Sequence, residues 1–192
     1  MEVQMHAYHP QGHFQKIYGI LILVGWGTLL PIGAMVARYL RKFPVVCDAW
    51  YKFHIVCQSQ GYVLGTIGWF MWIGMSSNHF VSKTQTTLNI IAFTFINVQM
   101  LATIMRPNKE AGYCKCWKIC HHVLGDAIIG IVIADIFVGL HNQSQSETLK
   151  WVYLGILGAL GVVVVPLEIF RCKTMIMHLA VGVNSGMFTI SP

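Results

Sequence analysis

The 192-residue sequence is 55% hydrophobic and only 10% charged, and its mean hydropathy is +0.59. These values exclude an ordinary soluble domain of this size. The formal net charge of +6 does not indicate a nucleic-acid partner, because the basic residues are not gathered into one soluble patch. We therefore expect an all-α membrane protein that contacts membrane lipid.

Five apolar runs follow one another along the chain, at residues 17–39, 53–75, 87–105, 119–140 and 151–170. Each is close to the roughly 20 residues that a helix needs to cross a bilayer. They predict an antiparallel bundle of five transmembrane helices with a four-helix core. We divide the chain into a flexible N-terminal segment (1–16), a transmembrane domain (17–171) and a tail (172–192). The first span acts as the targeting signal, because residues 1–16 contain no apolar stretch.

The 13 lysines and arginines are distributed unequally between the two sides of the predicted bundle. Ten fall on one side, including Arg38, Arg41, Lys52, Arg106 and Lys109. Since basic loops stay in the cytosol, this bias places the N-terminus outside the cytosol and the tail inside it. It does not indicate which membrane holds the protein.

The six cysteines all fall at or near the predicted cytosolic side. Thiols stay reduced there, so no disulfide framework is expected. Cys114 and Cys116 are more typical of lipidated or simple thiols than of a zinc site, because no second close pair accompanies them.

The second span carries Gly61, Gly65 and Gly68 on roughly one helical face with His54. Such a face suits either a flat cofactor or the close approach of a neighbouring helix, and the spacing fits both. In the third span, Asn89, Asn97 and Gln99 are expected to form hydrogen bonds between helices.

The fourth span contains two acidic residues, Asp126 and Asp135. Acids inside a bilayer are costly and are therefore candidates for a role in proton movement. Pairing with a neighbouring amide or histidine is the interpretation that we favour.

Two histidines enter the predicted membrane at matching depth from the cytosolic side. His54 lies in WYKFHIVCQ and His121 in WKICHHVLG, each just inside an apolar run that follows a basic loop. A neutral imidazole is a strong axial ligand of haem iron, and iron held by two of them has no open position and passes electrons. We predict one haem b with His54 and His121 as its axial iron ligands.

His122 competes with His121, because adjacent helical residues point about 100° apart and only one can face His54. An internal repeat favours His121: Tyr18 precedes His54 by 36 residues, and Gln85 precedes His121 by the same number. His122 is expected to hydrogen-bond a neighbour or the cofactor edge.

At this point the chain resembles the cytochrome b561 family, in particular the core of the plant proteins that also carry a DOMON domain. The resemblance covers about residues 18–170, and no DOMON domain is recognised in this sequence. The resemblance rests on four sequence motifs: GILILVGWGTLLPIGAMVARYLR, WYKFHIVCQSQGYVLGTIGW, MRPNK and WKICHHVLG.

The resemblance implies two haems, each clamped by histidines on alternate helices. His54 and His121 match one pair. Tyr18 and Gln85 stand where the family has the histidines of the other pair. We therefore expect the haem on the cytosolic side to be kept and the outer one to be lost, since neither tyrosine nor glutamine is a strong ligand without help.

By resemblance, the activity is at most that of an ascorbate-dependent transmembrane reductase, weakened as a relay because the second haem is lost. The basic residues around the retained site, Arg38, Arg41, Lys52, Arg106 and Lys109, would steer ascorbate or another anionic cytosolic donor. They are equally explained as topology markers. The alternative function is that of a haem-free family member that acts as a structural or interaction partner, in a homodimer or with another family member.

Overall fold

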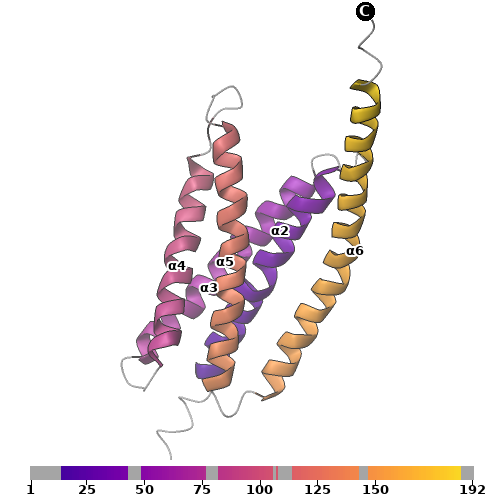
Figure 1. Ribbon diagram of the computed structural model, residues 1–192. Helices are drawn as coiled ribbons and strands as arrows, with labels where there is room; N and C mark the ends of the chain where they lie inside the picture. The colour runs from indigo at the N-terminus through magenta and orange to yellow at the C-terminus, as the bar shows by residue number, and fades with distance from the viewer. Residues whose placement is uncertain are drawn as a thin grey trace, which may run out of the picture. The chain divides into compact units, whose positions relative to one another are not determined.

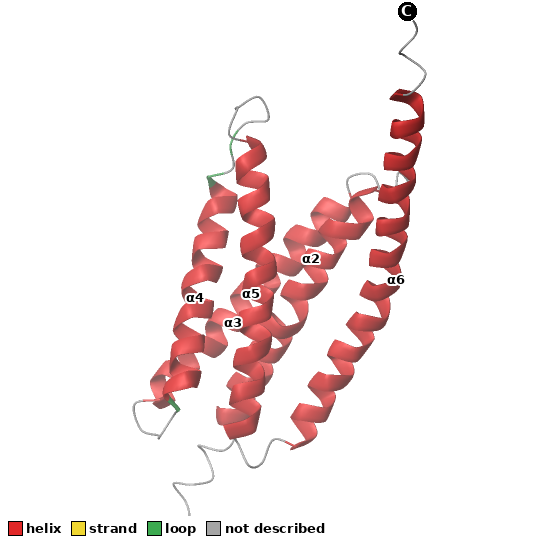
Figure 2. Cartoon of the chain, in the orientation of Figure 1, coloured by secondary structure: helices red, strands yellow, loops and turns green. Residues whose placement is uncertain are grey.

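The computed structural model describes residues 14–42, 49–76, 82–105, 107, 114–142 and 147–186. These residues are almost entirely helical and contain no strand, which confirms the all-α class (Figure 2). Arg106 and Lys109 lie outside the described residues, as does most of the predicted N-terminal segment.

The helices extend beyond the predicted apolar runs, because polar interfacial residues continue them by one or more turns. The first helix, Phe14–Tyr39, contains a π-helical segment η1 (Gly25–Leu29) and then α2 (Leu30–Tyr39), and ends in a short 3₁₀ turn, η2 (Leu40–Lys42). The others are α3 (Ala49–Ser76), α4 (Lys83–Ile104), α5 (Cys114–Asn142) and α6 (Glu147–Gly186). At 40 residues, α6 continues through most of the predicted tail.

Four of these helices are long and apolar enough to cross a membrane, namely Phe14–Tyr39, Lys83–Ile104, Cys114–His141 and Glu147–Thr174. The prediction of five spans is therefore supported for four. The remaining helix, α3, has 28 residues and is long enough. Its hydropathy is lowered by the polar run Gln58, Ser59 and Gln60.

The chain divides into two compact units, at Tyr153. In the first unit the first helix packs against α3 and α5, and α4 packs against α5 and α3, so that the four helices close into a ring (Figure 1). Successive helices run antiparallel. The second unit is the rest of α6, in which Arg171 and Glu168 form an ion pair of 3.2 Å one turn apart.

Glycines bring the first helix and α3 into backbone contact. A Cβ atom on Gly25 would lie 2.6 Å from the backbone nitrogen of Gly65, and one on Gly65 would overlap the indole of Trp26. A Cβ on Gly68 would lie 3.0 Å from the Ile22 side chain. The glycine face of α3 therefore serves helix packing, which is one of the two alternatives that its spacing left open.

Candidate functional site

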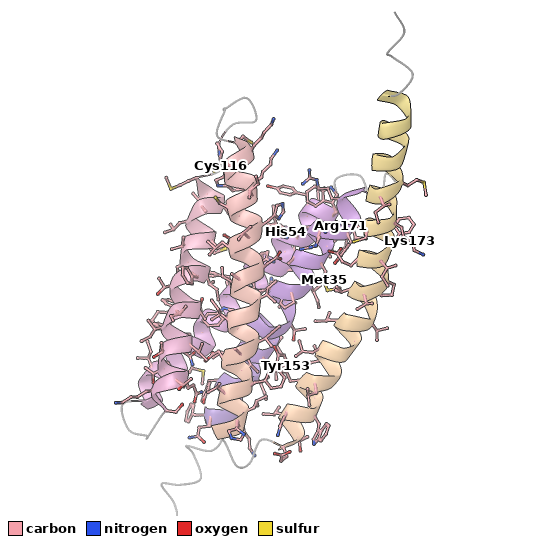
Figure 3. All side chains as sticks on the ribbon, viewed as in Figure 1. Met35, His54, Cys116, Tyr153, Arg171 and Lys173 are labelled. Atoms are coloured by element: carbon pink, nitrogen blue, oxygen red, sulfur yellow. The ribbon has the colours of Figure 1, made fainter. Side chains whose placement is uncertain are left out.

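One end of the four-helix ring carries Arg38, Arg41 and Lys52, where the first helix ends and α3 begins; we call it the basic end. His54 lies one helical turn into α3 from this end (Figure 3). Its side chain is half-buried, and its Nδ1 is 2.9 Å from the carbonyl oxygen of Gly33 in α2.

This contact indicates the tautomer of the neutral His54 ring. A carbonyl oxygen only accepts hydrogen bonds, so Nδ1 must carry the proton and donate it. The other nitrogen, Nε2, then has its lone pair available. A histidine held through Nδ1–H to a carbonyl is the arrangement by which proteins orient an imidazole toward a metal.

His121 is positioned by α4. Gln99 of α4 donates from Nε2 to the backbone oxygen of His121 over 2.7 Å, and Trp117 donates from Nε1 to the backbone oxygen of Ala102 over 3.0 Å. The His121 ring stacks on Trp117, with centroids 5.0 Å apart and planes 10° from parallel. Two side chain to backbone bonds thus hold the start of α5 against the end of α4.

His122 lies in a different, more charged environment. The His122 ring interacts electrostatically with three charged side chains, those of Arg38, Arg41 and Asp126, and also with the ring of His54. Arg38 of α2 donates from Nη1 to Asp126 Oδ2 of α5 over 3.1 Å, with side chains 40% and 60% exposed. Asp126 is therefore paired, as predicted, but its partner is an arginine.

Of the residues expected to steer an anionic donor, Arg41 and Lys52 are exposed at the basic end. Arg38 is also exposed there, although Asp126 offsets part of its charge. These three residues thus share one end with His54, whereas Arg106 and Lys109 lie in a part of the chain that the structure does not describe.

The basic end has the donor chemistry that a b-type haem requires. Among the described residues no group of three or more His, Cys, Asp or Glu could hold a bare metal ion. Haem needs only two axial donors, and a tautomer-fixed His54 is one such donor. Gln99 Oε1 is buried with no hydrogen-bond partner in the described chain, which is consistent with a polar interior next to His121.

The opposite end of the ring does not have this chemistry. Tyr18 and Gln85 are 8% and 7% exposed, and the Gln85 side chain fills the space beside Gly139, where a Cβ would lie 3.0 Å from its Nε2. Neither residue is a strong iron ligand. These two positions, which the family resemblance marks as a second haem site, therefore supply no strong axial donor.

A buried amide and carboxyl join α4 and α5 near this end. Asn89 donates from Nδ2 to Asp135 Oδ1 over 3.0 Å and also to the backbone oxygen of Gln85 over 3.2 Å. The predicted pairing of Asp135 with an amide is confirmed.

Asn97, like Asn89 and Gln99, was expected to form a hydrogen bond between helices, and it does so between α3 and α4. The hydroxyl of Tyr62 donates to Asn97 Oδ1 over 2.9 Å.

Comparison with known proteins shows three similar relatives from Arabidopsis thaliana, each a cytochrome b561 and DOMON domain-containing protein. The identities are 35% over 164 residues, 37% over 156 and 32% over 161, covering 84%, 80% and 83% of this chain. The chain spans 41%, 38% and 34% of their lengths, about two fifths or less. No family model and no solved structure matches the chain.

Proposed function

Because the chain belongs to the cytochrome b561 family, we propose that this membrane cytochrome transfers electrons through a single haem b, held by His54 and His121 at the basic end. The observation that carries this proposal is the 2.9 Å contact of His54 Nδ1 with the Gly33 carbonyl, which leaves Nε2 available. When bound, the haem supplies a one-electron centre. His54 and His121 would hold it through their ring nitrogens and would leave the iron no open position for substrate.

The side chains at the opposite end support a single haem. Tyr18 and Gln85 stand where the resemblance implies the histidines of the second site, and the buried Asn89–Asp135 hydrogen bond joins α4 and α5 in that half of the ring. An electron at the basic end then has most of a roughly 30 Å hydrocarbon layer to cross without a second haem. Transfer across the membrane is therefore weak, and exchange with partners at the basic end dominates.

The charges at the basic end support an anionic electron donor such as ascorbate. Arg41 and Lys52 are exposed there, and their field raises the local concentration of anions. In the orientation that the basic residues favour, this end faces the cytosol and the N-terminus lies on the other side.

The test is haem content and visible spectrum of the full chain, purified in detergent and reduced with dithionite. We expect one haem per chain and a bis-histidine b-type spectrum. His54→Ala should lose the haem, while His141→Ala, a histidine at the far end of α5, should keep it. Two haems per chain would overturn the loss of the second site.

A second candidate function is that of a haem-free partner in a homodimer or with another family member. The presence of Tyr18 and Gln85 favours it, because one of the two sites that the family resemblance implies has no strong iron ligand. Absence of haem in protein that is folded and expressed with excess haem precursor would support this candidate and overturn the first.

A further inference from the structure

Two exposed cysteines lie side by side on α5, and the second of them directly precedes His121 in the sequence. Cys116 and Cys120 are one helical turn apart, and their sulfur atoms are 4.0 Å from each other. Cys116 lies near the start of α5, at the end of that helix that begins with Cys114 (Figure 3). Both thiols belong to one helix, so the backbone fixes the distance between their Cβ atoms independently of other elements.

Helix geometry disfavours a disulfide between these thiols. Residues four apart on a helix have Cβ atoms about 5–6 Å apart, whereas a disulfide requires about 3.5–4.5 Å. Closing the bond would therefore distort the helix. A bridging atom between the two sulfurs removes this mismatch, because each sulfur then bonds to the bridge and not to the other sulfur.

The sulfur separation matches a bridging metal ion. Two metal–sulfur bonds of about 2.3 Å span about 4.0 Å when the sulfur–metal–sulfur angle is about 120°. The pair is thus already set for two positions of a trigonal thiolate site. No side-chain movement beyond small rotamer adjustments is needed.

We propose that Cys116 and Cys120 bind one cuprous ion. Soft thiolates select Cu(I), which is stable with two or three sulfur ligands. Zinc requires four ligands in a structural site, and the described residues contain no group of three or more metal-binding side chains. A small cytosolic thiol or a solvent molecule completes the coordination of the cuprous ion.

The charge around the pair supports this site. Two thiolates and one cuprous ion carry a net charge of −1. Lys115 and Lys118, both exposed, flank Cys116, and the N-terminal end of α5 adds partial positive charge.

The experiment is a titration of the full chain in detergent with Cu(I), under strictly reducing and anaerobic conditions, against a coloured Cu(I) chelator. We expect the wild type to remove one more equivalent of copper from the chelator than Cys116→Ser and Cys120→Ser do. Sulfur-to-copper charge-transfer absorption in the ultraviolet should appear with that equivalent and be absent in both variants.

Two controls separate the site from nonspecific thiol binding. Cys172→Ser removes an exposed cysteine elsewhere and should keep the full equivalent. Cys116→Ser combined with Ile119→Cys restores the number of thiols at an exposed position that has no cysteine three or four residues away, and it should not recover the equivalent. Equal copper uptake by the wild type and the Cys116→Ser/Cys120→Ser double variant, with unchanged helical content, would overturn the proposal.

Discussion

Asn89 on α4 and Asp135 on α5 are joined by a 3.0 Å hydrogen bond inside the helix ring, and the two side chains are only 2% and 3% exposed. Their positions are 46 residues apart in the sequence. The bond lies in the same half of the ring as Gln85, whose backbone oxygen also accepts a hydrogen bond from the Asn89 amide.

Asn89→Leu should destabilise the protein by about 1–3 kcal/mol, because it leaves the Asp135 carboxyl buried without its donor. Asp135→Leu alone leaves the Asn89 amide without its acceptor and should cost a similar amount. The double variant Asn89→Leu/Asp135→Leu should recover a large part of this loss, since neither unpaired group remains. Thermal unfolding in detergent measures all three. Additive losses in the double variant would contradict a direct energetic coupling.

Gly65→Ala should destabilise the contact between the first helix and α3, because a Cβ on Gly65 overlaps the Trp26 indole, and Trp26 is fully buried. Overpacking of this kind costs about 1–3 kcal/mol. Gly130→Ala on α5 is the matched control, since its Cβ meets nothing within 4 Å. That substitution should be neutral or stabilising by up to about 1 kcal/mol, the difference in helix propensity. Equal effects at both positions would show that the backbone contact is unimportant.

The sequence predicted the helical class and the positions of the helices well, because hydropathy and helical period are local properties. It also placed His54 one turn inside its helix, since the preceding Trp50, Tyr51 and Lys52 mark an interface. The sequence could not show whether the glycine face of α3, formed by Gly61, Gly65 and Gly68, lies against a cofactor or against a helix. That choice depends on the rotation of α3 against the first helix, which only the packed structure fixes.

The charged pair at the basic end was also not predictable. Arg38 and Asp126 are 88 residues apart, and their contact requires both the pairing of the first helix with α5 and the rotation of each. The same holds for the surroundings of His122, for which the sequence predicted only a hydrogen bond to an unspecified neighbour or to the cofactor edge. The sequence predicted that Asp135 pairs with an amide or a histidine. It could not show that the partner is Asn89, because the third span contains three amide side chains.

Asp126→Asn should accelerate reduction of the protein by ascorbate at low ionic strength. The substitution removes the negative charge that offsets Arg38, so the field on an anionic donor becomes more positive. Arg41→Gln should have the opposite effect. Both differences should shrink near 1 M salt, where the Debye length is only about 3 Å. Stopped-flow absorbance at two salt concentrations measures the rates.

The control for this prediction is Lys83→Gln, which removes one positive charge at the opposite end of the ring, where α4 begins. It should leave the ascorbate rate unchanged at both salt concentrations. Stability should change by less than about 1 kcal/mol in Asp126→Asn, because the ion pair is solvent-exposed. A rate increase that persists at high salt would argue against electrostatic steering.

Substitution by methionine should identify which histidine of α5 binds the iron. Methionine is itself an axial ligand, and a histidine–methionine haem has a higher reduction potential than a bis-histidine haem. His121→Met should therefore retain haem with a raised potential and an altered reduced spectrum. His122→Met should leave both properties close to those of the wild type if His121 is the ligand. The comparison is decisive because His122 interacts with His54 as well as with Arg38 and Asp126. Redox titration of the two variants provides the comparison. If the potential rises in His122→Met and not in His121→Met, the axial ligand is His122, and the 36-residue repeat is not a guide to the iron ligand on this helix.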